Sequence, residues 1–424
     1  MLAVKVDART WIAGVLGVLG GLLASCQPVA PRHPDLDGIA SRYVQLTREL
    51  ARHDPSLIDH WLIESPPSEL GGRRPVSTLH LQIDGLAGEA ETAVLGVSGA
   101  ARTRAEWLQG QVRALRLAAQ RLLGESLPFD TEARLAFGIA SQRADLFEAD
   151  RARETLDQVL PGTGPLGSRL ATFRARFRVP ATARDAVMRA ALDACRAATR
   201  AALALPADET VEVAWVEGLP WDAHAHYLGG HRTRIDVNAN VPLDLTRALH
   251  LACHEGYAGH HAQHIWLADG LVSARGWQEH ALVPGFGPAL LLAEGAAEAG
   301  TQLAMPPERR VQVYREQLAP ASGLSQLGGD AFDLLVRVEQ AQAALDPLIA
   351  DIAREYLDNQ INTATAIERL EQDVLMPGAE AFVLFIERRR TRVLAYTEGR
   401  HLALDRLGGT GLPGLRALFV PPMP

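Results

Sequence analysis

The chain has 424 residues, of which 47% are hydrophobic and 22% are charged, so it has ordinary globular composition and ample length for a large core. The formal charge of −8 at pH 7 argues against a nucleic-acid-binding protein, because such proteins carry a basic surface. Ala, Leu, Arg and Glu dominate while aromatic residues make up only 5%, which favours a mostly α-helical chain. The sequence has neither a Walker-type phosphate loop nor a nucleophile-elbow pattern.

The N-terminus has the pattern of a secretory signal. Lys5 and Arg9 precede an apolar run from Trp11 to Ala24. This run is shorter than the roughly 20 apolar residues of a membrane-spanning helix. The pattern predicts a signal peptide at residues 1–25.

The signal ends in Leu-Ala-Ser-Cys at 23–26, which resembles the lipobox of bacterial lipoproteins. In such proteins the cysteine becomes the first mature residue and carries lipid. We therefore expect lipidation of Cys26 and a Pro-rich tether at 26–35. Gln27 favours the outer membrane of a Gram-negative cell, with the protein facing the periplasm or the cell surface. An ordinary signal peptide with a chance cysteine is the alternative.

Beyond the tether, the hydrophobic pattern predicts a single mostly α-helical domain at 36–424. The predicted helices are 36–51, 101–123, 131–140, 142–159, 166–177, 181–205, 242–256, 290–303, about 308–318, 330–358, 363–374 and 379–405. Period-2 patterns predict strands at 210–216 and 233–238 on either side of a His- and Gly-rich loop, and a weaker one at 76–83. Cys195 and Cys253 fall in helical apolar patterns, and we expect them to be small buried hydrophobic side chains rather than part of a disulfide framework.

The strongest chemical signal is the stretch His-Glu-Gly-Tyr-Ala-Gly-His-His at 254–261. Zinc prefers neutral imidazoles and carboxylates in a tetrahedral shell with one open position, and the common His-Glu-x-x-His helix supplies two histidines one turn apart. Here His254 and His260 would diverge by about 120° on a straight helix. His254 and His261 share a face but are separated by a rise of about 10.5 Å. A straight helix therefore cannot form the site.

Gly256 and Gly259 offer a solution, because glycine tolerates the unusual backbone of a kink or bulge. A break there would bring His260 beside His254 and leave Glu255 facing the metal-bound water. His261 could replace His260 as ligand. The competing i,i+4 pairs, His250/His254 and His260/His264, both lack a glutamate directly after the first histidine, so His250 and His264 are expected to support the ligands or lie at the surface.

A third ligand must come from elsewhere in the chain. Glu294 lies on a later predicted helix with Glu298 one turn on, so that one carboxylate can bind the metal and the other orient a metal-binding histidine. Two such carboxylates on an Ala-rich helix can also be a solvated face. The sequence favours Glu294 as the ligand because the histidine stretch accompanies it.

Residues 254–263 resemble the His-Glu-x-x-Pro-Gly-His-His-x-Gln signature of a bacterial family known as domain of unknown function 885. Many of its members are lipoproteins, and it is grouped with the gluzincin-like zinc metallopeptidases. Glu294-Gly295-Ala296-Ala297-Glu298 resembles the second element of that family. The resemblance covers most of 130–405 and is strong only for 210–300. Ala258, Ala296 and Arg392 depart from the family pattern, where a proline, an aromatic residue and often a glutamine stand.

The resemblance implies a zincin-like α-helical metallopeptidase fold with a small β-sheet beside the motif helix. It implies a zinc ion (Zn²⁺) on His254, His260 and Glu294, Glu255 as the general base, and Tyr396 as an oxyanion donor. The family's aromatic-glycine loop and Asn-ended strand further point to a set of substrate-binding residues, namely Trp221, His226, Tyr227, Gly230 and Asn238.

These features predict a membrane-anchored, zinc-dependent peptidase. Glu255 would take a proton from the attacking water and deliver it to the leaving nitrogen. Tyr396 or a histidine at 224, 226 or 231 would stabilise the oxyanion. The alternative for the three histidines is a surface His-rich loop, and for Tyr396 an ordinary core or surface tyrosine. The strand at 233–238 would hold an extended peptide by strand addition. The alternatives are an inactive metal-binding or scaffolding lipoprotein and an amidase acting on a non-peptide or peptidoglycan amide; the oligomeric state is left open.

Overall fold

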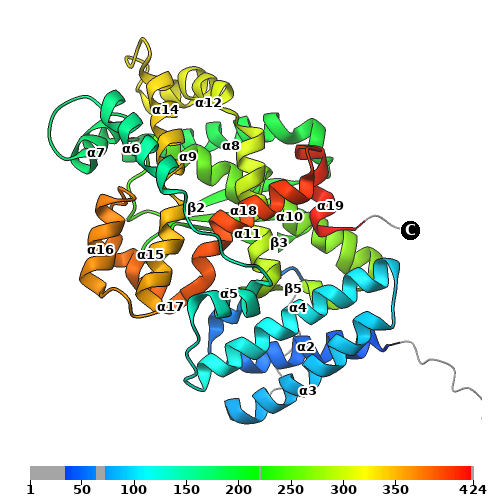
Figure 1. Cartoon of the computed structure of the whole chain (residues 1–424). Coiled ribbons are helices and arrows are strands. Elements are labelled where there is room, and N and C mark those ends of the chain that lie inside the picture. Colours follow the sequence, from blue (N-terminus) through cyan, green and yellow to red (C-terminus); the bar gives the residue numbers. More distant parts are fainter. Residues whose placement is uncertain (1–33, 64–71, 219–220, 422–424) are drawn as a thin grey trace, which may run out of the picture. The chain divides into compact units, whose positions relative to one another are not determined.

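The computed structural model describes residues 34–63, 72–218 and 221–421 (Figure 1). The predicted signal peptide, Cys26 and most of the tether lie outside the described residues. Residues Leu36–Pro424 form one compact unit, which is mostly helical with small sheets. No helix in the described part of the chain has the length and apolarity that a bilayer crossing needs.

Three N-terminal helices pack into a layer with its own apolar core. They are α2 (Leu36–Ala51), α3 (Val76–Leu95) and α4 (Gly99–Leu122), drawn in blue to cyan in Figure 1. Leu79, Ile83 and Leu86 of α3 recur at helical spacing and are buried in that core. The predicted strand at 76–83 was wrong, because so short a window does not separate the two periods.

Two sheets lie among the helices. In the first, β1 (Ile58–Trp61) pairs antiparallel with β5 (Leu282–Pro284), and neither strand was predicted. The second has three strands in the order β2-β4-β3. They are β2 (Thr210–Val216), β3 (Ala223–Gly229) and β4 (Arg232–Asn238), with β2 parallel and β3 antiparallel to β4.

This second sheet confirms the strands predicted at 210–216 and 233–238. The predicted loop between them instead contains β3, where buried Ala225 and Tyr227 alternate with His224 and His226. Strand addition to 233–238 was also wrong, because β4 is hydrogen-bonded on both edges. Within the described residues it is β3 that keeps one unpaired edge.

Helices form the rest of the molecule. Those before the motif are α5 (Phe129–Phe137), α6 (Leu146–Val159), α7 (Leu166–Ala175) and α8 (Arg184–Leu203). Those from the motif on are α9 (Leu245–Leu251), α10 (His260–Leu267), α11 (Gly287–Ala304), α12 (Pro307–Val313), α13 (Ala319–Ser322), α14 (Ala331–Ala343), α15 (Pro347–Leu357), α16 (Thr363–Gln372), α17 (Ala379–Arg389), α18 (Leu394–Leu407) and α19 (Leu415–Phe419).

Two long predicted helices are divided in the structure. The helix predicted at 330–358 becomes α14 and α15, since Pro347 begins a new helix. The one predicted at 379–405 ends at Arg390, which adopts a φ of 49°. The Arg390 side chain donates to the Leu127 carbonyl and pairs with Glu132, and these contacts to another part of the chain hold the break.

Helices α11 and α18 cross closely in the middle of the molecule (Figure 1). A Cβ added to Gly295 of α11 would lie 2.0 Å from the carbonyl carbon of Gly399 in α18, so only glycine permits this approach. The crossing brings Glu294 of α11 and Tyr396 of α18 to the same part of the interior.

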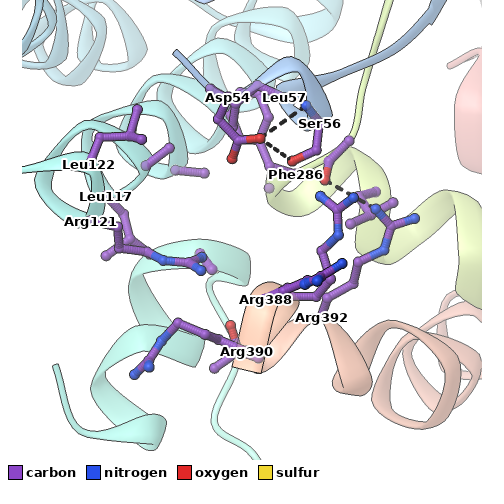
Figure 2. A pocket seen from close by; sticks show the side chains of 18 of the residues that line it. Asp54, Ser56, Leu57, Leu117, Arg121, Leu122, Phe286, Arg388, Arg390 and Arg392 are labelled. Carbon is purple, nitrogen blue, oxygen red and sulfur yellow. Dashed lines mark hydrogen bonds between the residues drawn. The ribbon is translucent and has the colours of Figure 1, made fainter. Parts of the chain in front are cut away.

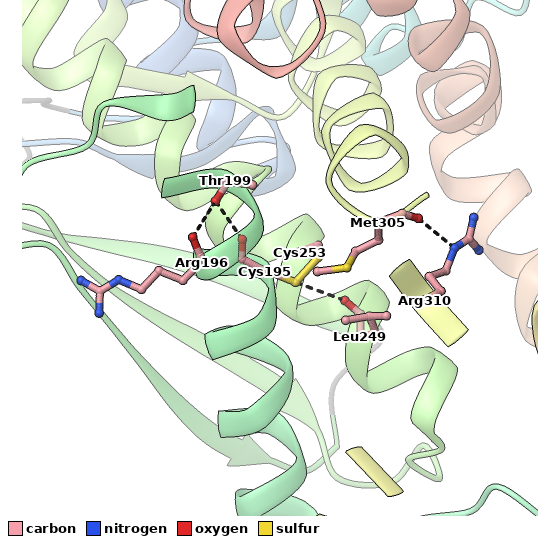
Figure 3. The surroundings of a disulfide bond; sticks show 7 residues. All are labelled: Cys195, Arg196, Thr199, Leu249, Cys253, Met305 and Arg310. Atoms are coloured by element: carbon pink, nitrogen blue, oxygen red, sulfur yellow. Dashed lines mark hydrogen bonds between the residues drawn. A yellow bond between two sulfur atoms is a disulfide. The ribbon is translucent and has the colours of Figure 1, made fainter. Parts of the chain in front are cut away.

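Cys195 of α8 and Cys253 form a disulfide, with Cα atoms 5.4 Å apart (Figure 3). Both residues are fully buried, as expected, but the prediction that they are simple apolar side chains was wrong. Their separation of 58 residues gave no sign that α8 packs against the segment preceding His254.

Candidate metal centre

The motif helix is broken where the glycines predict it. After α9 the chain forms a π-helical turn over Ala252–Tyr257, and Gly256 leaves helical geometry with φ −102° and ψ −118°. Gly259 (φ −126°, ψ −129°) precedes α10. A Cβ on Gly259 would lie 1.7 Å from the His254 carbonyl oxygen, so the chain can turn back on itself only with glycine there. The predicted break is confirmed.

The break brings three predicted ligands together. The rings of His254 and His260 have centroids 4.9 Å apart. Glu294 Oε2 lies 3.3 Å from His254 Nε2 and 3.5 Å from His260 Nε2. Ligand atoms of a tetrahedral zinc ion with bonds of about 2.05 Å are about 3.4 Å apart, and both carboxylate–imidazole distances match this spacing.

The electrostatics of this trio suit a cation. Burial alone would lower the pKa of His254 and His260, but Glu294 outweighs burial and raises both pKa values, assisted at His254 by Glu298. Burial would raise the pKa of Glu294, yet its hydrogen bonds to the two histidines hold it well below the usual range. Protons on the imidazoles and a divalent ion therefore compete for the same carboxylate.

Glu298 and His250 lie on one side of this trio. Glu298 Oε1 is 3.1 Å from His254 Nδ1 and 3.5 Å from His250 Nε2. Glu298 is thus placed to orient His254, in keeping with the role expected from the sequence. The side chain of His250 is 45% exposed. His250, His254 and Glu298 also lie close enough together to share an ion.

His261 is engaged elsewhere. Its Nδ1 is 2.8 Å from Thr233 Oγ1 and its Nε2 is 3.2 Å from Glu209 Oε2. Both contacts are buried and draw the ring toward β4 rather than toward Glu294. The geometry therefore favours His260 over His261 as the ligand.

A second polar group lies beside the trio, and of its members only His224 was a candidate from the sequence. His224 Nε2 lies 3.0 Å from both oxygens of Asp59, and His60 Nδ1 lies 2.9 Å from Asp59 Oδ2. Burial would lower the pKa of His224, but the hydrogen bonds and charge of Asp59 raise it. His264, which is buried, stacks 5.9 Å from His260 and lies 4.4 Å from His60, so a row of histidines joins the two groups.

The two predicted catalytic residues face the same interior. Glu255 is only 6% exposed, and its charge acts on His224, His254 and Tyr396. No described residue forms a hydrogen bond with its carboxylate. Burial, followed by the charge of Glu294, raises the pKa of Tyr396, which keeps the phenol protonated as a hydrogen-bond donor.

Arg392 completes this side of the interior. Its Nη2 lies 3.3 Å from Glu294 Oε1. It also acts on Tyr396, whose pKa its positive charge would lower. Arg392 was singled out from the sequence only as a departure from the family pattern.

The predicted substrate-binding residues divide into two groups. The Trp221 ring lies 5.8 Å from that of His224, near the polar group at Asp59. The others stabilise the sheet. Asn238 donates a hydrogen bond to the Trp221 carbonyl, and His226 pairs with Asp236. Tyr227 accepts a hydrogen bond from the backbone N–H of His231, and Gly230 forms the turn after β3 with a φ of 56°. His231 pairs with Asp208 and Asp269, so of the three candidate histidines only His224 is bound to the group beside the trio.

No family model matches the sequence, and no curated protein is significantly similar to it. Two solved structures were found to be similar to this chain. A protein from Colwellia psychrerythraea, considered a lipoprotein, aligns with a TM-score of 0.50 and 15% identity over 81% of this chain. A protein of unknown function from Shewanella oneidensis, also considered a lipoprotein, gives 0.45 and 12% over 91% of this chain and 74% of its own. The present chain spans 66% of the Colwellia protein.

Proposed function

We propose that this protein is a zinc-dependent hydrolase that cleaves peptide bonds. The observation that carries the proposal is the convergence of His254, His260 and Glu294 at a glycine-broken helix, with Glu255 buried directly after the first histidine. These three residues would hold the ion. Once bound, zinc supplies Lewis acidity and an activated water at neutral pH.

The remaining chemistry belongs to the protein's own side chains. Glu255 accepts a proton from the attacking water and returns it to the leaving nitrogen. Tyr396, protonated because of its raised pKa, and His224, whose pKa is raised by Asp59 against the effect of burial, are the donors for the developing oxyanion. Glu298 and Asp59 position His254 and His224 respectively.

A peptide suits the unpaired edge of β3. This strand carries His224 and packs near the π-helical turn that holds His254 and Glu255. An extended peptide can add to such an edge through backbone hydrogen bonds and present its carbonyl to the centre. The buried carboxylate of Glu255 pairs with no described residue, so it makes no structural contact that an inactive scaffold would require. This favours the enzyme over the scaffold.

A lipid anchor at Cys26 forms part of the same proposal. The lipobox-like sequence supports it, and the two structural neighbours are both considered lipoproteins. We propose attachment to the outer membrane, with the compact unit on the periplasmic or outer face.

The test combines metal analysis with Glu255→Gln. Purified protein is expected to carry one zinc ion per chain and to cleave a peptide library. Glu255→Gln should keep the metal and lose about 1,000-fold or more in cleavage rate, whereas exposed Glu217→Gln should retain both. A parent protein that binds no zinc would sink the proposal. Undiminished cleavage by Glu255→Gln would refute its role as the base.

A further inference from the structure

A cavity of about 360 Å³ is lined by an unusual concentration of arginines (Figure 2). It is at the small end of the size range of ligand-binding pockets. Its five arginines are Arg121, Arg388, Arg389, Arg390 and Arg392. Figure 2 shows side chains from opposite walls, including Arg121 and Arg392, around the open space.

The carboxylates around the cavity leave part of this positive charge unpaired. Arg390 pairs with Glu132, and Arg392 with Glu294. Neither Arg388 nor Arg389 forms an ion pair with any described residue. Burial and then the positive charge of Arg392 lower the pKa of Arg389, which shows that like charges crowd this wall.

The two acidic residues of the cavity lining form no ion pair with its arginines, although the charge of Asp54 acts on Arg121 and Arg389. Asp54 Oδ1 accepts hydrogen bonds from the backbone and hydroxyl of Ser56. Glu125 accepts one from Gln120. The cavity is therefore suited to an anion from outside the chain. A planar guanidinium pairs with a carboxylate through two parallel hydrogen bonds.

The cavity adjoins the metal centre along three chain segments. Ser56 and Leu57 line it, and β1 follows with Asp59. Leu290 of α11 lines it, and Glu294 lies one turn further along the same helix, a rise of about 6 Å.

Arg392 makes the third connection. It lines the cavity while its guanidinium contacts Glu294. One side chain thus touches both the cavity and a proposed metal ligand.

We propose that the arginine cavity binds the C-terminal carboxylate of the peptide substrate. This rests on the proposed function and names its substrate class: peptides with a free C-terminus, from which C-terminal residues are released. The cavity lies beside the metal centre because Arg392 lines it and also contacts Glu294. Water adds across the C–N bond, a new C–O bond forms, and the released amine carries away the terminal carboxylate.

Direct binding to the zinc-loaded Glu255→Gln protein tests this without turnover. A tripeptide such as Ala-Leu-Ala is titrated calorimetrically as the free acid and as the C-terminal amide. We expect the acid to bind at least about 10-fold more tightly, the scale of one charged hydrogen bond. Adding Arg388→Gln and Arg389→Gln should abolish this difference while zinc content and thermal stability stay unchanged, because neither arginine has a carboxylate partner to orphan. Exposed Arg309→Gln is the matched control.

Equal binding of acid and amide, or an acid preference that survives the double substitution, would overturn the inference. A third peptide, amidated but carrying a glutamate, separates the sources of the carboxylate. If it binds as tightly as the free acid, recognition of the C-terminus is refuted. If the acid preference is present but the parent protein cleaves nothing, the proposed peptidase fails and the anion-binding cavity stands.

Discussion

His250 lies four residues before His254 and His260 lies six residues after it, and their environments differ. His260 Nε2 faces Glu294 at 3.5 Å, whereas His250 faces Glu298 with a half-exposed side chain. We expect His260→Ala to weaken zinc binding by more than about 100-fold, because loss of a supporting partner alone typically costs about 10- to 100-fold.

His250→Ala serves as the comparison for this prediction. It removes one contact to Glu298 and should weaken zinc binding by no more than about 10- to 100-fold, the loss expected for a supporting residue. Competition with a chromophoric chelator at fixed pH measures both affinities. A larger loss of zinc affinity in His250→Ala than in His260→Ala would contradict this prediction and would indicate that the ion binds to His250, His254 and Glu298 instead.

At the scale of elements, the centre depends on one backbone turn. In Gly259→Ala the new Cβ would meet the His254 carbonyl oxygen, so the turn between the π-helical segment and α10 must open. We expect a loss of about 2–3 kcal/mol or more in the free energy of unfolding, together with loss of zinc binding.

Gly88 in the middle of α3 provides the matched substitution, since a Cβ there would have nothing within 4 Å. Gly88→Ala should raise the free energy of unfolding by about 0.5–1 kcal/mol, because alanine is the better helix former. Denaturant melts and zinc titration compare the two variants. Equal stability of both would show that the turn adapts to a side chain.

The disulfide ties α8 to the segment that ends in His254. Closing a loop of 58 residues is expected to stabilise the folded chain by about 4 kcal/mol through the entropy of the unfolded state. Replacing both Cys195 and Cys253 with alanine should lower the free energy of unfolding by about that amount. Reductant should then destabilise the parent protein but leave the variant unaffected. A variant as stable as the oxidised parent would contradict this expectation.

Features formed by residues close together in the sequence were predictable, and features formed by residues far apart in the sequence were not. The break at Gly256 and Gly259 was predictable, because it follows from helix geometry and the spacing of His254 and His260 within one short stretch. Asp59 was not predictable, since it reaches His224 only because β1 lies against β3, which is distant in the sequence, and β1 carries no motif. The disulfide depended in the same way on distant packing.

At the scale of the whole molecule, the candidate centre draws on β1, β3, the motif segment, α11 and α18. The core that supports it includes carboxyl groups that stay protonated at unusually high pH. Burial raises the pKa of Glu339 in α14 and of Asp346 before α15 to about 7 each. Glu339 Oε1 accepts a hydrogen bond from Tyr314, and a glutamine in its place can still accept it.

These two carboxyls predict how the stability of the whole chain depends on pH. Their folded-state pKa of about 7 exceeds the ordinary values of 4.5 and 3.8, so the folded state binds the extra protons and stability falls as pH rises from about 4.5 to 7. Shifts of this size correspond to about 3–4 kcal/mol per group as an upper bound. The double variant Glu339→Gln, Asp346→Asn should match the parent near pH 4 and exceed it by several kcal/mol at pH 8, as measured by denaturant unfolding. Since every other titrating group is shared, the difference between the two curves isolates this pair, and parallel curves would show that both carboxyls are ionised in the folded protein.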